Sequence, residues 1–289
     1  MILETTPKKK KDNNQIKNII FTILKYVVMI FAVVVVILPL IPIFFGSFKT
    51  NSDFLDSGVF ALPKQFTVDN YVTAFVDGNM IKGFMNTAII LIISLVVSVL
   101  TGAMTAYVIS RFKFKGKSII KALFLVATLL PSITNNIATF QMMATLELFN
   151  TRIGGILLFS GTDIIAVYIM LQYLDNISIS LDESAMMDGA NYFKIFFKII
   201  LPLLMPAALT VGIIKGVAIY NDFVTPYLFM PSSDLAMIST ALFNFKGPYS
   251  AQWEVICAGI IITTLPILIV FLIAQKKIYN GLVLGSVKE

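Results

Sequence analysis

Residues 84–108 read FMNTAIILIISLVVSVLTGAMTAYV, without one charged side chain. A helix needs about 20 consecutive apolar residues to cross the hydrocarbon core of a bilayer, so this run is long enough. In hydrocarbon, each backbone N–H and C=O group must find its partner inside the protein, and a helix satisfies them within its own segment. The stretch therefore predicts a membrane-spanning helix and an all-α membrane protein.

The composition of the whole chain agrees with this prediction. Of its 289 residues 57% are hydrophobic and only 13% are charged, and the mean hydropathy is +0.88. About a quarter of the residues of a soluble domain are charged, which is far more than in this chain, so a soluble globular protein is excluded. Cys257 is the single cysteine, and histidine is absent. We therefore expect no disulfide, no Cys/His metal site and no His-based catalysis. No catalytic residue is predicted in this chain.

Five further stretches extend the prediction to six transmembrane helices. They are residues 26–48, 122–146, 153–174, 201–230 and 255–275. The first run is too long for a signal-peptide core and is not followed by a cleavage site, so it should remain as a helix. The predicted domain covers residues 26–275, between tails at 1–25 and 276–289. Its outer segment, 46–80, is long for a loop and should contain short structure of its own.

The distribution of Lys and Arg predicts the orientation. With the N-terminus inside, most of the 22 basic residues fall in cytoplasmic segments, as the positive-inside rule requires. Both termini are then cytoplasmic. These residues are Lys8, Lys9, Lys10, Lys11, Lys17, Lys25, Arg111, Lys113, Lys115, Lys117, Lys121, Lys194, Lys198, Lys276, Lys277 and Lys288. The net charge of +6 thus reflects topology and does not indicate a nucleic-acid partner.

A polar loop, residues 175–200, separates two of the predicted spans. Asn, Ser and Asp residues precede good helix formers there, which predicts a short helix from Leu181 or Asp182 to Met187. Gly189 supplies the backbone freedom for a tight turn, and a second helix should start near Asn191 and run to Ile200. The short helix would stand clear of the bundle and present Glu183, whose carboxylate suits a charge-assisted bond to an Arg.

The loop resembles the "EAA" loop of ATP-binding-cassette importer permeases, E-A-A-x-x-D-G-A, a spacer and F-x-x-I-x-L-P. Ser184 replaces the usual second Ala, and Pro202 and Pro206 follow in register. In that family the loop docks in a cleft of a separate ATPase subunit. The resemblance therefore implies an ATPase-coupling role for Glu183, Ser184, Ala185, Asp188, Gly189 and Ala190.

Most of the chain is similar to the carbohydrate-uptake subclass, the second permease of maltose-type importers. The matches include Asn86-Thr87, Arg111-Phe112, Asn221-Asp222-Phe223 and an ending with Gly285, Ser286, Val287 and Lys288. Tyr220 stands in place of the usual Trp, Ser178 in place of Pro and Glu147 in place of Gly. The resemblance implies a C-terminal tail that reaches toward the ATPase subunits.

The same resemblance implies the partners. The chain should be a permease in a bacterial-type cell membrane that imports a carbohydrate of the oligosaccharide class. It would form a heterodimer with a second permease and work with two ATPase subunits and an extracellular sugar-binding protein. ATP and Mg would be bound by the ATPase subunits, and this chain would hold no cofactor.

Two other functions remain as alternatives. A permease of the same architecture could move another solute, such as a polyamine, but the long outer segment and the C-terminal tail argue against it. A free-standing secondary transporter is the second alternative. Many such transporters contain inverted repeats, which are not evident here, and no phosphate-cradling Gly-rich loop is present for ATP hydrolysis in the same chain.

Polar residues inside the predicted spans mark a candidate substrate pathway. Charges at membrane depth are costly and face protein or water. Lys215 and Asp222 lie seven residues apart, on one face of the predicted helix 201–230. They either line a polar cavity, or Lys215 pairs with a neighbouring helix or subunit through a group such as Asp163. The candidate pathway residues are Asn135, Asn136, Lys215, Tyr220, Asn221 and Asp222.

Overall fold

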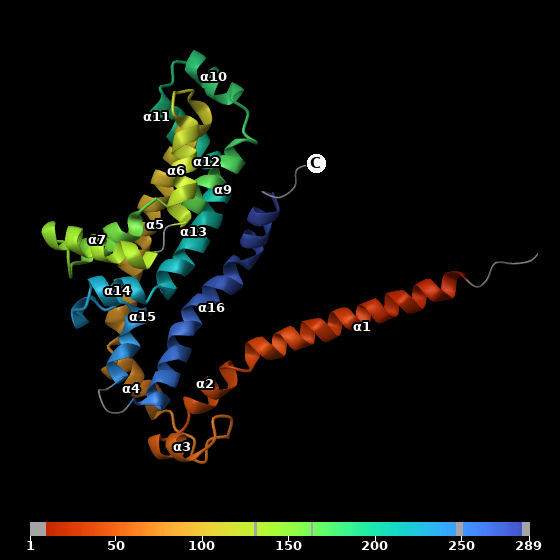
Figure 1. The fold of residues 1–289 in the computed structure, drawn as a ribbon, viewed down its shortest axis with the longest axis vertical. Coiled ribbons are helices and arrows are strands. Elements are labelled where there is room, and N and C mark those ends of the chain that lie inside the picture. The colour runs from red at the N-terminus through yellow and green to blue at the C-terminus, as the bar shows by residue number, and fades with distance from the viewer. Residues whose placement is uncertain (1–9, 130–131, 163, 247–250, 285–289) are drawn as a thin grey trace, which may run out of the picture. The chain divides into compact units, whose positions relative to one another are not determined.

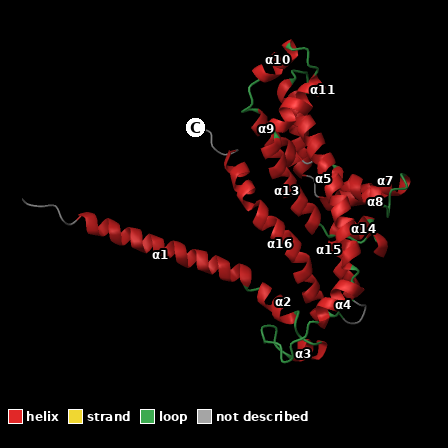
Figure 2. Cartoon of the chain, turned by 180° about the vertical axis from the view of Figure 1, so that it is seen from behind, coloured by secondary structure: helices red, strands yellow, loops and turns green. Residues whose placement is uncertain are grey.

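The computed structural model of the chain describes residues 10–129, 132–162, 164–246 and 251–284, and their named elements are all helices (Figure 2). The prediction of an all-α protein is confirmed. The chain divides into two compact units. The first comprises residues up to Tyr71 with Gln252–Ile261, and the second comprises Val72–Ala251 with the chain from Ile262 onward.

The first unit contains α1 (Lys10–Ile37), α2 (Leu40–Gly46), α3 (Asn51–Asp56) and the beginning of α16 (Trp253–Leu284). Its outer segment has structure of its own, as predicted. The buried Lys49 ammonium donates to Ser57 Oγ at 2.7 Å and to the Gly58 carbonyl at 3.1 Å. The buried Asn70 amide donates to the carbonyls of Ser47 and Lys49. These bonds compensate polar groups that are removed from water.

The second unit is built around one long helix, α5 (Met80–Arg111). Helices α8 (Arg152–Ser160), α9 (Ile164–Leu174) and α13 (Met205–Asn221) pack along it (Figure 1). Small residues permit the close packing: a Cβ added at Gly102 would lie 3.8 Å from Ala166 Cβ. The buried core between these helices includes Ala103, Val167, Met170, Leu174 and Val211.

Shorter helices complete the second unit. At the end of α5 that carries Arg111 lie α10 (Ser180–Met187), α11 (Tyr192–Ile195), the π-helix η1 (Phe196–Ile200) and α12 (Leu201–Leu203) (Figure 1). The other part of the unit contains α14 (Val224–Phe229), α15 (Ile238–Ala241) and the 3-10 helices η2 (Ser233–Leu235) and η3 (Leu242–Phe245). Helix α4 (Asp69–Asp77) begins in the first unit and continues into the second from Val72. Thus α5 extends between these two groups of short helices.

The described helices account for up to five spans by length and composition, rather than the six predicted. Three are continuous: Lys17–Gly46, Met80–Arg111 and Trp253–Gln275. Two are bent pairs, α8 with α9 and Tyr192–Leu203 with Met205–Asn221, and the second pair bends by 73°. The predicted span 122–146 instead forms α6 (Lys117–Leu129) and α7 (Ser132–Thr145). The kink expected at Pro131 lies outside the described residues.

The prediction of one continuous helix over residues 201–230 is wrong. Helix α13 ends at Asn221, and Asp222 adopts an extended backbone conformation. Its carboxylate accepts the Thr225 backbone N–H at 2.9 Å and the Thr225 hydroxyl at 2.7 Å, so it caps the start of α14. A carboxylate that binds the backbone in this way competes with helix continuation. Hydropathy alone does not detect such a break, because the residues on both sides are apolar.

Candidate coupling site between α10 and α5

The predicted coupling helix forms where the sequence places it. Helix α10 runs from Ser180 to Met187, and Ser178 Oγ accepts the Ser180 backbone N–H at 3.3 Å. Asp182 and Glu183 lie in its first turn, where negative charge is favourable beside the unpaired N–H groups. The local sequence therefore favours a helix start at this place.

Helix α10 ends in a Schellman motif around Gly189. The Ala190 N–H donates to the Ala185 carbonyl at 2.9 Å, and the Gly189 N–H donates to the Met186 carbonyl at 3.0 Å. The φ angle of Gly189 is +79°, in the left-handed region that glycine adopts without steric cost. This confirms the predicted turn. Asn191 then caps α11 by accepting the Lys194 N–H at 2.9 Å.

The predicted coupling residues divide between two faces of α10. Glu183, Ser184, Asp188 and Gly189 are exposed, whereas Ala185 is buried and Ala190 is half-buried. Asp182, three residues before Ala185, is also buried, so the inner face of the helix follows the i, i+3 spacing. Neighbouring acidic residues, Asp182 and Glu183, thus have opposite environments.

The buried Asp182 carboxylate links α10 to α5. The Tyr107 hydroxyl donates to its Oδ1 at 2.8 Å, and Arg111 Nε lies 3.1 Å from its Oδ2. The side chains of Arg111 and Asp182 are only 8% and 4% exposed. The guanidinium also donates to the Ile177 carbonyl at 2.8 Å, just before α10. We call Tyr107, Arg111 and Asp182 the inner triad.

Aromatic rings pack beside Tyr107 of the inner triad. The Tyr107 ring centroid lies 5.5 Å from that of Phe196, at the start of η1. Phe112 lies 6.1 Å from Tyr107 and 5.0 Å from Tyr192, measured between ring centroids. An ion pair in such a low-dielectric environment interacts more strongly than a pair in water. The sequence analysis missed Asp182, since its partners lie more than 70 residues away along the chain.

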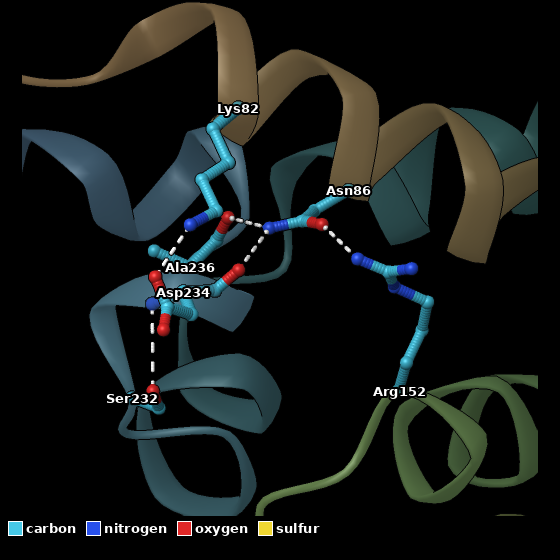
Figure 3. Close-up of polar contacts among 6 residues, drawn as sticks. All are labelled: Lys82, Asn86, Arg152, Ser232, Asp234 and Ala236. Carbon is cyan, nitrogen blue, oxygen red and sulfur yellow. Dashed lines mark hydrogen bonds and ion pairs between the residues drawn. The ribbon is translucent and has the colours of Figure 1, made fainter.

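A second polar cluster lies at the opposite end of α5 (Figure 3). The buried Asn86 amide donates to the carbonyls of Asp234 at 2.9 Å and Ala236 at 3.1 Å, and its own carbonyl accepts from Arg152 at 2.9 Å. Lys82 forms an ion pair with Asp234, and this contact holds the pKa of the Asp234 carboxyl below its ordinary value. We call Lys82, Asn86, Arg152 and Asp234 the outer cluster.

Lys215, a predicted pathway residue, contacts neighbouring helices. Its ammonium donates to Ser98 Oγ on α5 and to the carbonyl of Gly161, which follows α8. A cation at this place neutralises the partial negative charge at the C-terminus of α8. Asp163, the partner suggested by the sequence, lies outside the described residues. Lys215 is therefore integrated into the helix packing at the break between α8 and α9.

The other predicted pathway residues have separate surroundings. The Tyr220 hydroxyl donates to the Thr263 carbonyl at 2.7 Å, and the exposed Asn221 amide donates to the Val217 carbonyl of its own helix. On α7, Asn135 is exposed and Asn136 is half-buried. The tail residues Gly285 to Lys288 lie outside the described residues, so their predicted role stays a prediction.

A cavity of about 530 Å³ lies between α5, α13 and the part of α16 in the second unit. Leu95 and Val99 of α5, Ile213 and Tyr220 of α13, and Ile267 of α16 line it, with other aliphatic residues. A sugar requires hydrogen-bonding partners for its hydroxyl groups, and this lining provides few. The cavity is therefore suited to apolar groups.

Comparison with known proteins identifies the family. Residues 98–282 match the model of the family described as "Binding-protein-dependent transport system inner membrane component". The chain belongs to this family. The match includes both the polar loop and the inner triad, so the candidate site lies within the family domain.

Named relatives of the permease match it along nearly its whole length. The probable starch degradation products transport system permease protein AmyC of Thermoanaerobacterium thermosulfurigenes is 32% identical, over 92% of this chain and 97% of that protein. The galactooligosaccharides transport system permease protein GanQ of Bacillus subtilis is 29% identical, over 95% and 98%. The arabinooligosaccharides transport system permease protein AraQ of Halalkalibacterium halodurans is 29% identical, over 89% and 93%.

A solved structure shares the fold of the permease. It is a chain of a bacterial ABC transporter involved in the import of the acidic polysaccharide alginate, with a TM-score of 0.77 and 22% identity. The alignment covers 94% of this chain and 99% of that chain. The arrangement of helices is therefore that of an ABC transporter permease.

Proposed function

We propose that this chain is a membrane-spanning subunit of an ATP-driven importer for oligosaccharides, and that it receives mechanical input through α10. The observation that carries this proposal is the division of α10 into two faces. Its inner face is attached to α5, and its outer face presents Glu183, Ser184 and Asp188. A rigid short helix with an exposed carboxylate is suited to bind a basic cleft on another protein.

The family supports a division of labour between chains. A binding-protein-dependent system needs a substrate-binding protein, and we propose that this permease also pairs with a second permease and two ATPase subunits. The chain itself contains no phosphate-cradling Gly-rich loop. ATP hydrolysis therefore belongs to the ATPase subunits, with Glu183 among the residues that contact them.

Oligosaccharides are the substrate class that the relatives favour. AmyC, GanQ and AraQ are named for starch degradation products, galactooligosaccharides and arabinooligosaccharides. This favours a carbohydrate over a polyamine. The large cavity of this chain is lined by aliphatic side chains, so we propose that polar contacts to the sugar require residues of the second permease as well.

The charge distribution supports a cytoplasmic location for α10. Lys113 and Lys115 follow α5, while Lys194 and Lys198 follow α10, and all four are exposed. By the positive-inside rule, this end of the permease faces the cytoplasm, where ATP is available. The outer cluster then faces the extracellular side, from which a substrate-binding protein would deliver its ligand.

The test uses the complete transporter purified through a tag on this chain and reconstituted in proteoliposomes. Uptake of a mixture of malto-, arabino- and galacto-oligosaccharides and ATP hydrolysis are measured with Glu183→Ala. We expect loss of the ATPase subunit or at least a roughly tenfold fall in uptake, since a charge-assisted contact contributes about 1.5–3 kcal/mol.

Asp77→Ala is the matched control, because Asp77 is an exposed carboxylate in the outer segment. It should retain both the ATPase subunit and uptake. Normal uptake by Glu183→Ala would contradict the proposed coupling role of α10. A wild-type chain that purifies without any ATPase subunit would contradict the importer as a whole.

A further inference from the structure

We propose that the inner triad is the mechanical connection between the coupling helix and the membrane-spanning part of the permease. Tyr107 and Arg111 would act as positioning residues that hold Asp182, so that displacement of α10 moves α5. This inference rests on the proposed function, because it assumes that an ATPase subunit displaces α10.

The contacts assign different tasks to two consecutive residues. Glu183 is exposed and available to a partner protein, whereas Asp182 is buried and occupied by Tyr107 and Arg111. A force applied at Glu183 is therefore passed to the adjacent Asp182, which is attached to α5. The connection thus reaches α5 directly as well as through the chain between α9 and α10.

The attachment has the geometry of a rigid contact. Asp182 accepts a hydrogen bond from Tyr107 and forms an ion pair with Arg111. These two residues of α5 are four positions apart and lie one above the other on one face of the helix. Arg111 simultaneously holds the Ile177 carbonyl, so the chain before α10 is fixed by the same guanidinium. Tyr107 and Arg111 are the attachment points on α5, and Ile177 and Asp182 are those on the coupling segment. Together these contacts restrict both sliding and rotation of α10.

The burial of the inner triad disfavours any state in which Asp182 is only partly separated from Arg111. Separating Asp182 from Arg111 without an influx of water would leave a charge unpaired in a low-dielectric site, which is costly. The side chains of Arg111 and Asp182 are only 8% and 4% exposed, so water has little access to the pair. Helix α10 is therefore expected to move together with α5 rather than to slide past it.

Helix α5 is suited to carry the displacement across the membrane. It is continuous from Met80 to Arg111, with no proline in its sequence. Its far end holds the buried Asn86, which binds the segment after α14 through two backbone carbonyls. A shift at the inner triad would thus be transmitted to the outer cluster by one rigid element.

The experiment measures oligosaccharide imported per ATP hydrolysed, in the reconstituted complex and with the same oligosaccharide mixture. Two variants remove single contacts: Asp182→Asn removes the charge of the carboxylate, and Tyr107→Phe removes only the hydroxyl. Because Glu183 is intact, the ATPase subunit should remain bound. We expect the import per ATP to fall roughly tenfold in Asp182→Asn and severalfold in Tyr107→Phe, in line with the loss of buried charged hydrogen bonds.

Tyr168→Phe is the matched control. The Tyr168 hydroxyl on α9 donates to the Lys121 carbonyl at 3.2 Å, so this variant also removes one tyrosine hydrogen bond but leaves α10 untouched. Its import per ATP should equal that of the wild type. Arg111→Lys keeps the positive charge but loses the planar guanidinium. Its import per ATP should lie between those of the wild type and Asp182→Asn.

The ratio separates a positioning role from a merely structural one, because poor folding lowers the amount of complex but not the import per ATP of what assembles. An unchanged ratio in Tyr107→Phe and Asp182→Asn, measured on any assembled fraction, would overturn the proposal. If the wild type retains its ATPase and imports sugar while these variants do so equally well, only the inner triad proposal fails. If the wild type binds no ATPase, the proposed function itself fails.

Discussion

Helix α5 carries one ion pair near each end, and the two pairs differ in burial. At the outer cluster, the side chains of Lys82 and Asp234 are 41% and 78% exposed, while those of Arg111 and Asp182 are 8% and 4% exposed. Water screens the first pair and competes for its charges, so its contribution to stability is small. The second pair cannot lose one partner without leaving a buried charge. The same chemical contact therefore has different consequences at the two ends.

The buried group of the outer cluster is neutral. Asn86 is only 2% exposed and uses its amide to bind three groups from two other segments. A neutral amide costs less to bury than a charge, and its bonds compensate that cost. The outer end of α5 is therefore held mainly by an amide, and the inner end by a charge pair.

The largest expected effect is that of removing the inner charge pair. Arg111→Met should lower the free energy of unfolding by about 3–5 kcal/mol, because Asp182 is left buried without its partner. Thermal unfolding of the purified chain in detergent measures this loss. Lys82→Met, the matched change in the outer cluster, should unfold close to the wild-type temperature. Equal losses in the two variants would remove the distinction between the two ends.

A smaller effect is expected from Asn86→Leu, which preserves side-chain volume but removes three hydrogen bonds. We expect a loss of about 2 kcal/mol, because the carbonyls of Asp234 and Ala236 lose their donor. Thermal unfolding measures stability, and limited proteolysis near residues 233–236 reports local loosening. Asn176→Leu is the control, since Asn176 is exposed and bonds only within its own segment. Resistance of the 233–236 segment in Asn86→Leu would contradict the assigned role.

The smallest effect concerns the pH dependence of the outer ion pair. Lys82 lowers the pKa of Asp234, so this pair stabilises the folded state above the ordinary aspartate value of 3.8. The contribution should disappear as the pH falls from 3.8 through the lowered folded-state pKa. Unfolding temperatures of the wild type and Asp234→Asn, compared across this range, should differ slightly at neutral pH and converge in acid. A difference that grows in acid would reverse the assigned sign.

Local sequence signals predicted the coupling helix well. The helix start before Asp182, the turn at Gly189 and the second helix after Asn191 all depend on residues within a few positions of each other. The same holds for α5, whose apolar length is visible in the sequence. Prediction was weaker where helices break, as at Asp222, because the capping contact to Thr225 competes with a strongly apolar pattern.

The sequence by itself determined that this chain is an all-α membrane protein with a polar loop at residues 175–200 that contains a short helix, because these properties follow from composition and local backbone preferences. Only the tertiary structure decided which acidic residue of α10 is buried and which is exposed. Asp182 and Glu183 are chemically alike and adjacent, and Tyr107 lies 75 residues from Asp182 along the chain. Their difference arises when the packing of α9 and α13 on α5 brings Tyr107 and Arg111 to one face of the coupling helix.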